Sequence, residues 1–217
     1  MNVGAWLRHL LPPGRYPLNL ANDYCGPDLE AFPYQVAGGP VNPKARAWAK
    51  AREYERRLAL YRWAEQLNDP AAPRYRVLLD DCESAILMTL EAVVQFIGDQ
   101  LHRERGVASV EAWLQQKPAN DLLFRGLRTL RHLEAHIEAR PAASLIIAQV
   151  GGSPSIRRRW QLASLQQADL DKLRTPRLKS AELAQWNEMI ERDSAAELLR
   201  RGLDRVVELV AAAEQEL

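Results

Sequence analysis

The sequence is poor in cysteine, lacks a long apolar run and has almost no net charge. Its 217 residues include two cysteines, Cys25 and Cys82, which are too few for a disulfide framework and form no C-x-x-C pair. No run of about 18 apolar residues occurs, so a membrane span is not expected. Basic residues number 29 against 28 acidic ones, which excludes the strongly basic composition of a dedicated nucleic-acid coat protein. These features predict reduced thiols and a cytoplasmic location.

The common cofactor and catalytic motifs are also missing from the sequence. It contains no G-x-G-x-x-G, no P-loop, no H-E-x-x-H and no G-x-S-x-G. Only His132 and His136 have the spacing of a metal-binding pair, and the arginines around them would repel a cation. The acidic run Asp80, Asp81 and Glu83 fits a helix N-terminus better than a magnesium site. We therefore expect neither a metal nor a cofactor.

The overall composition of the chain is typical of a globular protein. Hydrophobic residues make up 47% of the chain and charged residues 26%, which is enough to build a buried core. Residues 1–42 are rich in proline and glycine, which block helix interiors and permit turns, so they predict an irregular N-terminal arm. Residues 43–217 have the length of a single domain and read mostly as amphipathic helix, so they predict one helical domain.

Apolar residues at helical spacing, together with capping residues, predict a series of helices. Asn120 or Asp121 is expected to cap the fourth of them, and Ser180 and Ser194 two later ones, with Glu197 completing a capping box. The predicted segments are 43–67, 76–105, 109–116, 120–140, 165–174, 181–193 and 195–217.

Two β-rich runs, "SLIIAQV" and "IRRRWQL", interrupt this helical pattern. They are separated by "GGSPS", which is typical of the loop of a β-hairpin, here at about 144–163. The predicted fold class is therefore mostly α: an irregular helical bundle with one small β-hairpin inserted after the helix over 120–140.

That helix contains "RGLRTLRHLEAH", residues 125–136, where arginine and histidine are concentrated. At 100° per residue, Arg125, Arg128, His132 and His136 share one face and the leucines share the other. Such a basic face suits an anionic partner, because arginine binds phosphate bidentately and histidine exchanges protons near neutral pH. An ordinary solvated helix face, with glutamates pairing to the arginines, is the alternative interpretation.

Residues 131–136 match the pattern R-x4-H, with a polar residue directly after the arginine. This resembles the signature of the HEPN superfamily, whose members are helical nucleases and nucleotide-binding modules of toxin–antitoxin, CRISPR and phage-defence systems. Arg125 and His132 also fit a looser R-x6-H form. The resemblance is close over about 12 residues and extends loosely over 76–140.

The resemblance implies a homodimer in which two motif helices face each other and cut RNA without a metal. By position, Arg131 would stabilise the phosphate, His136 would act as acid and base, and His132 would take the polar second position. An antitoxin or a subunit of a larger complex would be a further partner. Many members of the superfamily are inactive, so the resemblance also allows a binding role.

A second basic patch follows in the predicted hairpin, where Arg157, Arg158 and Arg159 precede Trp160. Arginines beside an aromatic ring can bind phosphate and stack on an unpaired base, whereas charges on an exposed strand also serve to guard a sheet edge. Two functions therefore stay open. One is a HEPN-like, metal-independent endoribonuclease that uses 2′-hydroxyl attack in stress or phage defence. The other is a non-catalytic helical interaction module, a subunit of a larger complex that docks protein or nucleic acid through its basic face.

Overall fold

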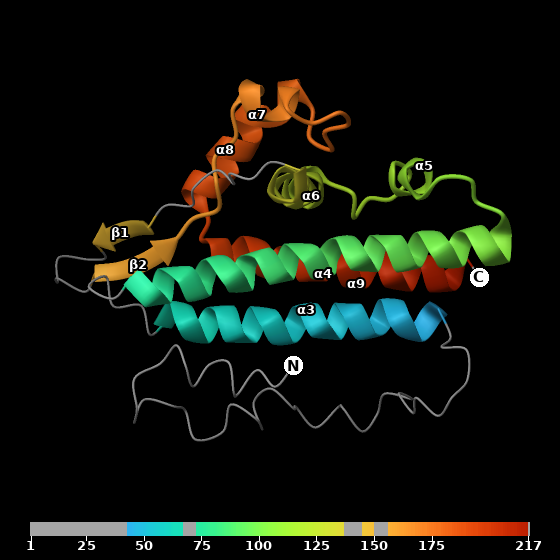
Figure 1. Ribbon diagram of the computed structural model, residues 1–217, viewed down its shortest axis with the longest axis horizontal. Helices are drawn as coiled ribbons and strands as arrows, with labels where there is room; N and C mark the ends of the chain where they lie inside the picture. The colour runs from blue at the N-terminus through green and yellow to red at the C-terminus, as the bar shows by residue number, and fades with distance from the viewer. Residues whose placement is uncertain (1–42, 67–72, 137–144, 150–155, 217) are drawn as a thin grey trace, which may run out of the picture.

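Three long helices form the base of the molecule in the computed structural model (Figure 1). The structure describes residues 43–66, 73–136, 145–149 and 156–216, with side chains over 46–65, 79–135 and 160–216. Helices α3 (Pro43–Gln66), α4 (Pro73–Arg105) and α9 (Ala195–Gln215) pack along one another. The mostly α fold class is confirmed, whereas the predicted arm over 1–42 lies outside the described residues.

Apolar side chains at helical spacing on these three helices meet in one core. Tyr54 of α3 is fully buried, and its hydroxyl donates a hydrogen bond to the carbonyl oxygen of Leu199 on α9 at 2.8 Å. Gly202 of α9 allows this approach, because a Cβ atom there would lie 2.7 Å from the Tyr54 hydroxyl and 2.6 Å from Leu127. Within the described part of the chain, no helix is both long and apolar enough to span a membrane.

Helix α6 (Leu122–His136) contains the motif and crosses over this base, so that it is seen end-on above α4 in Figure 1. The predicted cap is confirmed at its start, where the Phe124 amide donates to Asp121 Oδ1 at 3.0 Å. Gly126 lets α8 (Leu183–Arg192) come close, since a Cβ atom at 126 would lie 2.2 Å from ring atoms of the buried Trp186.

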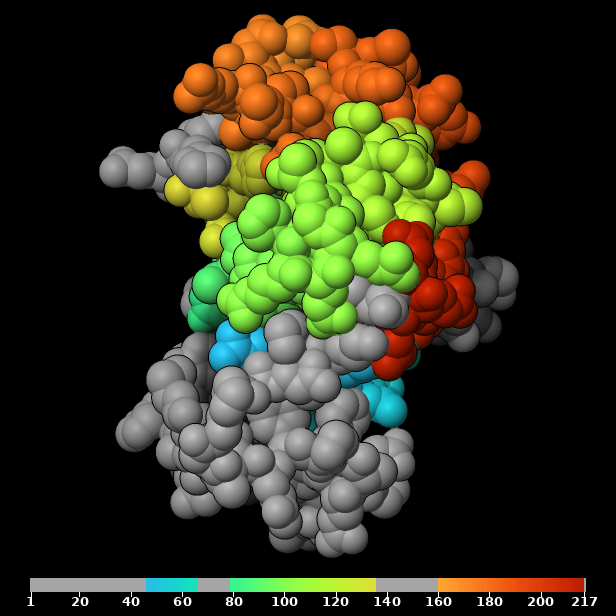
Figure 2. Space-filling view, turned by 90° about the vertical axis from the view of Figure 1, so that its right-hand side faces the viewer, coloured from blue at the N-terminus to red at the C-terminus, as the bar shows by residue number. Residues whose placement is uncertain are grey.

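The short helix α5 (Val110–Leu114) links α4 to α6 and is tied to the end of the chain. Ser109 caps it by accepting the Ala112 amide. Trp113 Nε1 donates to Glu216 Oε2 at 2.7 Å, and Lys117 forms an ion pair with the same carboxylate. Figure 2 shows the red C-terminal end of α9 against the yellow-green α5 segment.

Two short strands, β1 (Leu145–Gln149) and β2 (Ile156–Trp160), pair antiparallel with Leu145 opposite Trp160 and Gln149 opposite Ile156. The residues that connect them lie outside the described part of the chain, so the hairpin as a whole stays a prediction. Helix α7 (Gln167–Asp171) and the 3₁₀ turn η2 (Ser180–Glu182) follow before α8. The predicted cap at Ser180 is wrong, because Glu182 folds back to accept the Lys179 amide at 2.9 Å.

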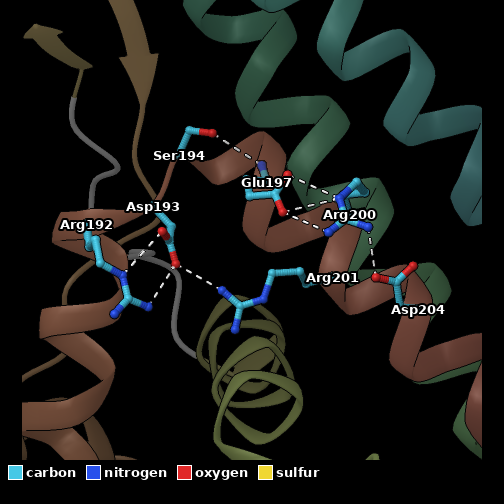
Figure 3. Close-up of polar contacts among 7 residues, drawn as sticks. All are labelled: Arg192, Asp193, Ser194, Glu197, Arg200, Arg201 and Asp204. Carbon is cyan, nitrogen blue, oxygen red and sulfur yellow. Dashed lines mark hydrogen bonds and ion pairs between the residues drawn. The ribbon is translucent and has the colours of Figure 1, made fainter.

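Acidic and basic side chains surround the junction between α8 and α9 (Figure 3). Ser194 caps α9 as predicted, by accepting the Glu197 amide at 3.3 Å. Only half of the predicted capping box forms, because the Glu197 carboxylate instead accepts Arg200 Nη2 at 2.8 Å. Asp193 accepts hydrogen bonds from Arg192 and Arg201 and so links the two helices.

Candidate functional site

The most enclosed charged side chain of the motif is Arg128, in the middle of α6. Its side chain is 1% exposed, so the prediction that it lies on a basic face open to an anionic partner is wrong. Its Nε and Nη2 donate to the two oxygens of Glu91 at 2.8 and 2.9 Å. Its Nη1 and Nη2 donate to Glu111 at 3.1 and 2.7 Å. One guanidinium is therefore bound by two carboxylates of the same chain.

Five side chains from four separate segments make up this ion cluster. Glu91 comes from α4, Glu111 from α5, Arg128 and His132 from α6, and Arg177 from the segment between α7 and η2. Arg177 Nη2 lies 2.9 Å from Glu111 Oε1, and His132 Nε2 lies 3.8 Å from Glu91 Oε1. The cluster therefore joins parts of the fold that are far apart in the sequence.

The electrostatics of the cluster follow from burial and from opposite charges in contact. Burial alone would raise the pKa of Glu91, but hydrogen bonds from Arg128 and His132 outweigh it and lower this pKa to about 2. Burial would likewise lower the pKa of Arg128, whereas Glu91 and Glu111 raise it above its ordinary value. For Arg177, burial and the neighbouring charge of Arg128 lower the pKa. Glu91 and Arg128 are thus held in their charged forms.

The N-terminal half of α6 is covered on its predicted basic side as well. Arg125 forms an ion pair with Glu182 of η2, and it also donates to the Asn120 carbonyl oxygen. The Thr129 hydroxyl is buried, where it accepts the Leu178 amide at 2.9 Å and donates to the Arg125 carbonyl oxygen at 2.9 Å. The amphipathic pattern could not show this, because the covering residues come from 177–182, some fifty positions later.

The C-terminal half of α6 is less enclosed and contains the pair that fits the HEPN pattern. Arg131 is partly buried, with its Nη1 3.7 Å from Glu134 Oε2 one turn along the helix. His132 is also partly buried and faces Glu91. His136 is the last residue of α6, and its side chain lies outside the described residues. The joint action of Arg131 and His136 therefore stays a prediction.

The second predicted basic patch loses its aromatic member. Trp160 is 3% exposed and belongs to the core, so it cannot stack on a base as predicted. Its backbone amide donates to Glu65 Oε1 of α3 at 3.3 Å, which fixes the end of β2 against the bundle. Arg157, Arg158 and Arg159 lie in β2, but their side chains are outside the described residues.

The acidic run and the cysteine next to it do not gather into a site. Asp81 is exposed whereas Glu83 is buried, and the described residues contain no group of three His, Cys, Asp or Glu side chains arranged to hold a metal ion. Cys82 is buried, and burial together with the negative charge of Asp81 raises the pKa of its thiol to about 12. A thiol in this environment stays protonated and unreactive at neutral pH.

Glu91, Glu111 and Arg177 are site residues that sequence reasoning missed. Each is a single charged residue on a different segment, and no spacing in the sequence links one to another. Only Glu91 gave a signal in the sequence. It lies on a helix with many apolar core residues, and a carboxylate in such a place needs a cation or a hydrogen-bond donor beside it. Comparison of the chain with protein-family models, with curated proteins and with solved structures finds no match.

Proposed function

We propose that this chain is a non-catalytic helical interaction module, a subunit that docks other protein chains. The observation that supports this is the neutralisation of α6: Arg125, Arg128 and Arg131 each pair with carboxylates of their own chain. A site that stabilises a phosphate in a transition state needs donors that are still available to it. The ion cluster is instead suited to bracing α4, α5 and α6 against one another.

The sequence placed the docking surface on the basic face of α6, whereas this proposal places it on an uncharged helix face. Nucleic acid would require exposed cations along a face, and the α6 guanidiniums are paired or buried. Docking of protein through an uncharged helix face needs no such cations. A cytoplasmic location fits this role and belongs to the proposal.

The experiment is a cleavage assay on labelled single-stranded RNA, with and without EDTA. We expect the wild-type chain to leave the RNA intact, as will His132→Ala and His136→Ala. Cleavage by the wild type that both alanine variants lose, with unchanged circular dichroism, would overturn the proposal. Arg200→Ala is the matched control for the loss of a basic side chain outside α6, because its ion pairs lie within α9.

One specific observation favours a second candidate, the HEPN-like metal-independent endoribonuclease. His132, on the same helix as Arg131, lies beside the Glu91 carboxylate of α4, and a carboxylate can orient an imidazole for proton transfer. RNA would then be the substrate, an antitoxin a possible partner, and stress or phage defence the setting. The same assay decides between the two, because this enzyme would release fragments ending in a 2′,3′-cyclic phosphate whether or not EDTA is present.

A further inference from the structure

Helix α4 keeps one face uncovered along most of its length. At 100° per residue, nine of the twelve exposed or partly exposed positions between 81 and 103 fall within a stripe about 100° wide, and the partly exposed Glu91, Phe96 and Gly98 lie just outside it. Leu87 and Leu90, outside this stripe, are fully buried. In Figure 1 the helix lies in front of α9, with α3 below it and α6 above. We call this face the α4 stripe; its residues are Asp81, Ser84, Ala85, Met88, Ala92, Gln95, Asp99, His102 and Arg103.

The middle of the α4 stripe has no charged residue. Between Asp81 and Asp99 it presents only small or uncharged side chains, and Met88 at its centre is 52% exposed. A solvated helix face is normally rich in charge. Seven of the nine members, at positions 81, 85, 88, 92, 95, 99 and 102, follow each other at alternating steps of four and three residues, which is the spacing by which one helix packs on another. The stripe therefore has the pattern of a helix-docking face.

Charge at the two ends of the stripe indicates what covers it. The N-terminal end is acidic at Asp81, and the C-terminal end is basic at His102 and Arg103, all three exposed. A parallel copy of α4 would place like charges together, which costs binding energy. An antiparallel copy centred near residues 91–92 places each acidic end beside the basic end of the other copy. In this arrangement Asp99 faces the uncharged Ser84.

We propose that the α4 stripe docks a second copy of this chain, with the two α4 helices antiparallel about a two-fold axis near residues 91–92. Met88 of each copy then packs beside Gln95 of the other, and Ala85 and Ala92 allow the helix backbones to come close. The dimer implied by the HEPN resemblance would bring α6 against α6 instead. This inference deepens the proposed function by naming the partner, and it rests on residues outside the ion cluster.

The test is the solution mass of the full chain by analytical ultracentrifugation over a range of concentrations. We expect a dimer, and we expect Met88→Glu to raise its dissociation constant by about tenfold or more, because the new charges enter an uncharged contact. Val207→Glu is the matched control: Val207 is the other exposed large apolar residue of the described chain, at 39%, and it lies on α9. A monomeric wild type, or an equal effect of the two substitutions, would overturn the proposal.

A second pair of variants tests the orientation and guards against a folding defect. Ala92→Glu, at the proposed axis, is expected to act like Met88→Glu, with thermal melting showing that both variants fold. Asp81→Arg is expected to weaken the dimer, and adding Arg103→Asp is expected to restore it, since the exchanged charges face each other only in the antiparallel arrangement. A double variant no stronger than Asp81→Arg would overturn this arrangement.

The two proposals fail independently. A monomeric wild type that cuts no RNA would overturn the docking of a second copy and leave the α4 stripe to a different protein. A dimer that Met88→Glu weakens and that cuts RNA, with cleavage lost in His132→Ala and His136→Ala, would overturn the non-catalytic function and support the docking.

Discussion

At the scale of single residues, Arg128 shows how a charge that suggests ligand binding can be structural. Its guanidinium makes four hydrogen bonds to Glu91 and Glu111 and has almost no contact with solvent. Removing the guanidinium and the carboxylates from water costs free energy. Their attraction recovers this free energy only when the geometry satisfies the hydrogen-bond donors and acceptors. Arg128 stabilises the fold while both carboxylates accept its hydrogen bonds. Loss of either the arginine or a carboxylate leaves an unpaired charge, which lowers the free energy of unfolding.

Arg128→Met is therefore expected to lower the free energy of unfolding by about 3–5 kcal/mol, because two carboxylates remain without their main partner. Chemical denaturation measures this change. Arg131→Met is the matched control on the same helix, and its single pair one turn away predicts a loss below about 1 kcal/mol. Equal losses in the two variants would show that Arg128 does not act as a buried partner.

The pH dependence of stability should report Glu91. Its pKa is lowered from the ordinary 4.5 to about 2, so its contribution is complete above pH 4.5 and is lost as the pH falls toward 2. The contribution is on the order of 3 kcal/mol. Unfolding measured between pH 4.5 and 2 should become easier by a larger amount in the wild type than in Glu91→Gln. Parallel curves for the two proteins would mean that Glu91 is not held ionised by Arg128.

At the scale of elements, the position of α6 depends on direct contact between its backbone and one side chain of α8. Gly126 faces the ring of Trp186, whose Nε1 donates to the Ala163 carbonyl oxygen at 3.3 Å. Both the ring and the α6 backbone are therefore fixed in place. Glycine in a helix interior lowers stability by about 1 kcal/mol relative to alanine. At position 126 the missing side chain is what allows α6 and α8 to pack closely.

Gly126→Ala should destabilise the protein by about 1–3 kcal/mol, because the new methyl group overlaps the Trp186 ring and outweighs the gain in helix propensity. In the Trp186→Leu background, the same alanine is expected to cost far less. A double-mutant cycle measured by thermal unfolding gives the coupling between the two positions. No coupling, or a stabilising alanine in the single variant, would contradict the packing of α6 on α8.

At the scale of the whole molecule, specific polar contacts add to the shared core in joining distant parts of the chain. The end of α9 closes on α5 through Glu216, and α9 also contacts α3 through Trp48, whose Nε1 donates to Glu214 at 3.3 Å. Hydrogen bonds from Lys117 and Trp113 outweigh the effect of burial and lower the pKa of Glu216. The last turn of the chain is thereby part of the fold.

Glu216→Ala is expected to loosen α5 while leaving the three-helix base intact. Loss of two hydrogen bonds to a partly exposed carboxylate, together worth about 1.5 kcal/mol, should speed amide exchange in residues 110–114 by about tenfold. Glu214→Ala serves as the control, because its partner lies on α3. Unchanged exchange in α5, or the same pattern in both variants, would show that Glu216 does not hold this segment.

Sequence reasoning predicted local features well and long-range ones poorly. The helices, the cap at Asp121 and the cap at Ser194 depend on neighbouring residues and are confirmed. The burial of Arg128 and Trp160 depends on residues that arrive from elsewhere in the chain, and no spacing encodes their meeting. A helical wheel separates apolar from polar positions, but it cannot tell a face that meets water from one that meets carboxylates of other helices.

The contact of Gly126 with Trp186 also has a consequence for how such a sequence can diverge. Neither residue can change freely while the other stays, since a side chain at 126 needs the space that the indole ring fills. Substitutions at the two positions should therefore appear together: glycine wherever 186 is tryptophan, and a larger residue at 126 only beside a smaller one at 186. Positions 126 and 186 should therefore covary among related sequences, although they are sixty residues apart in the chain.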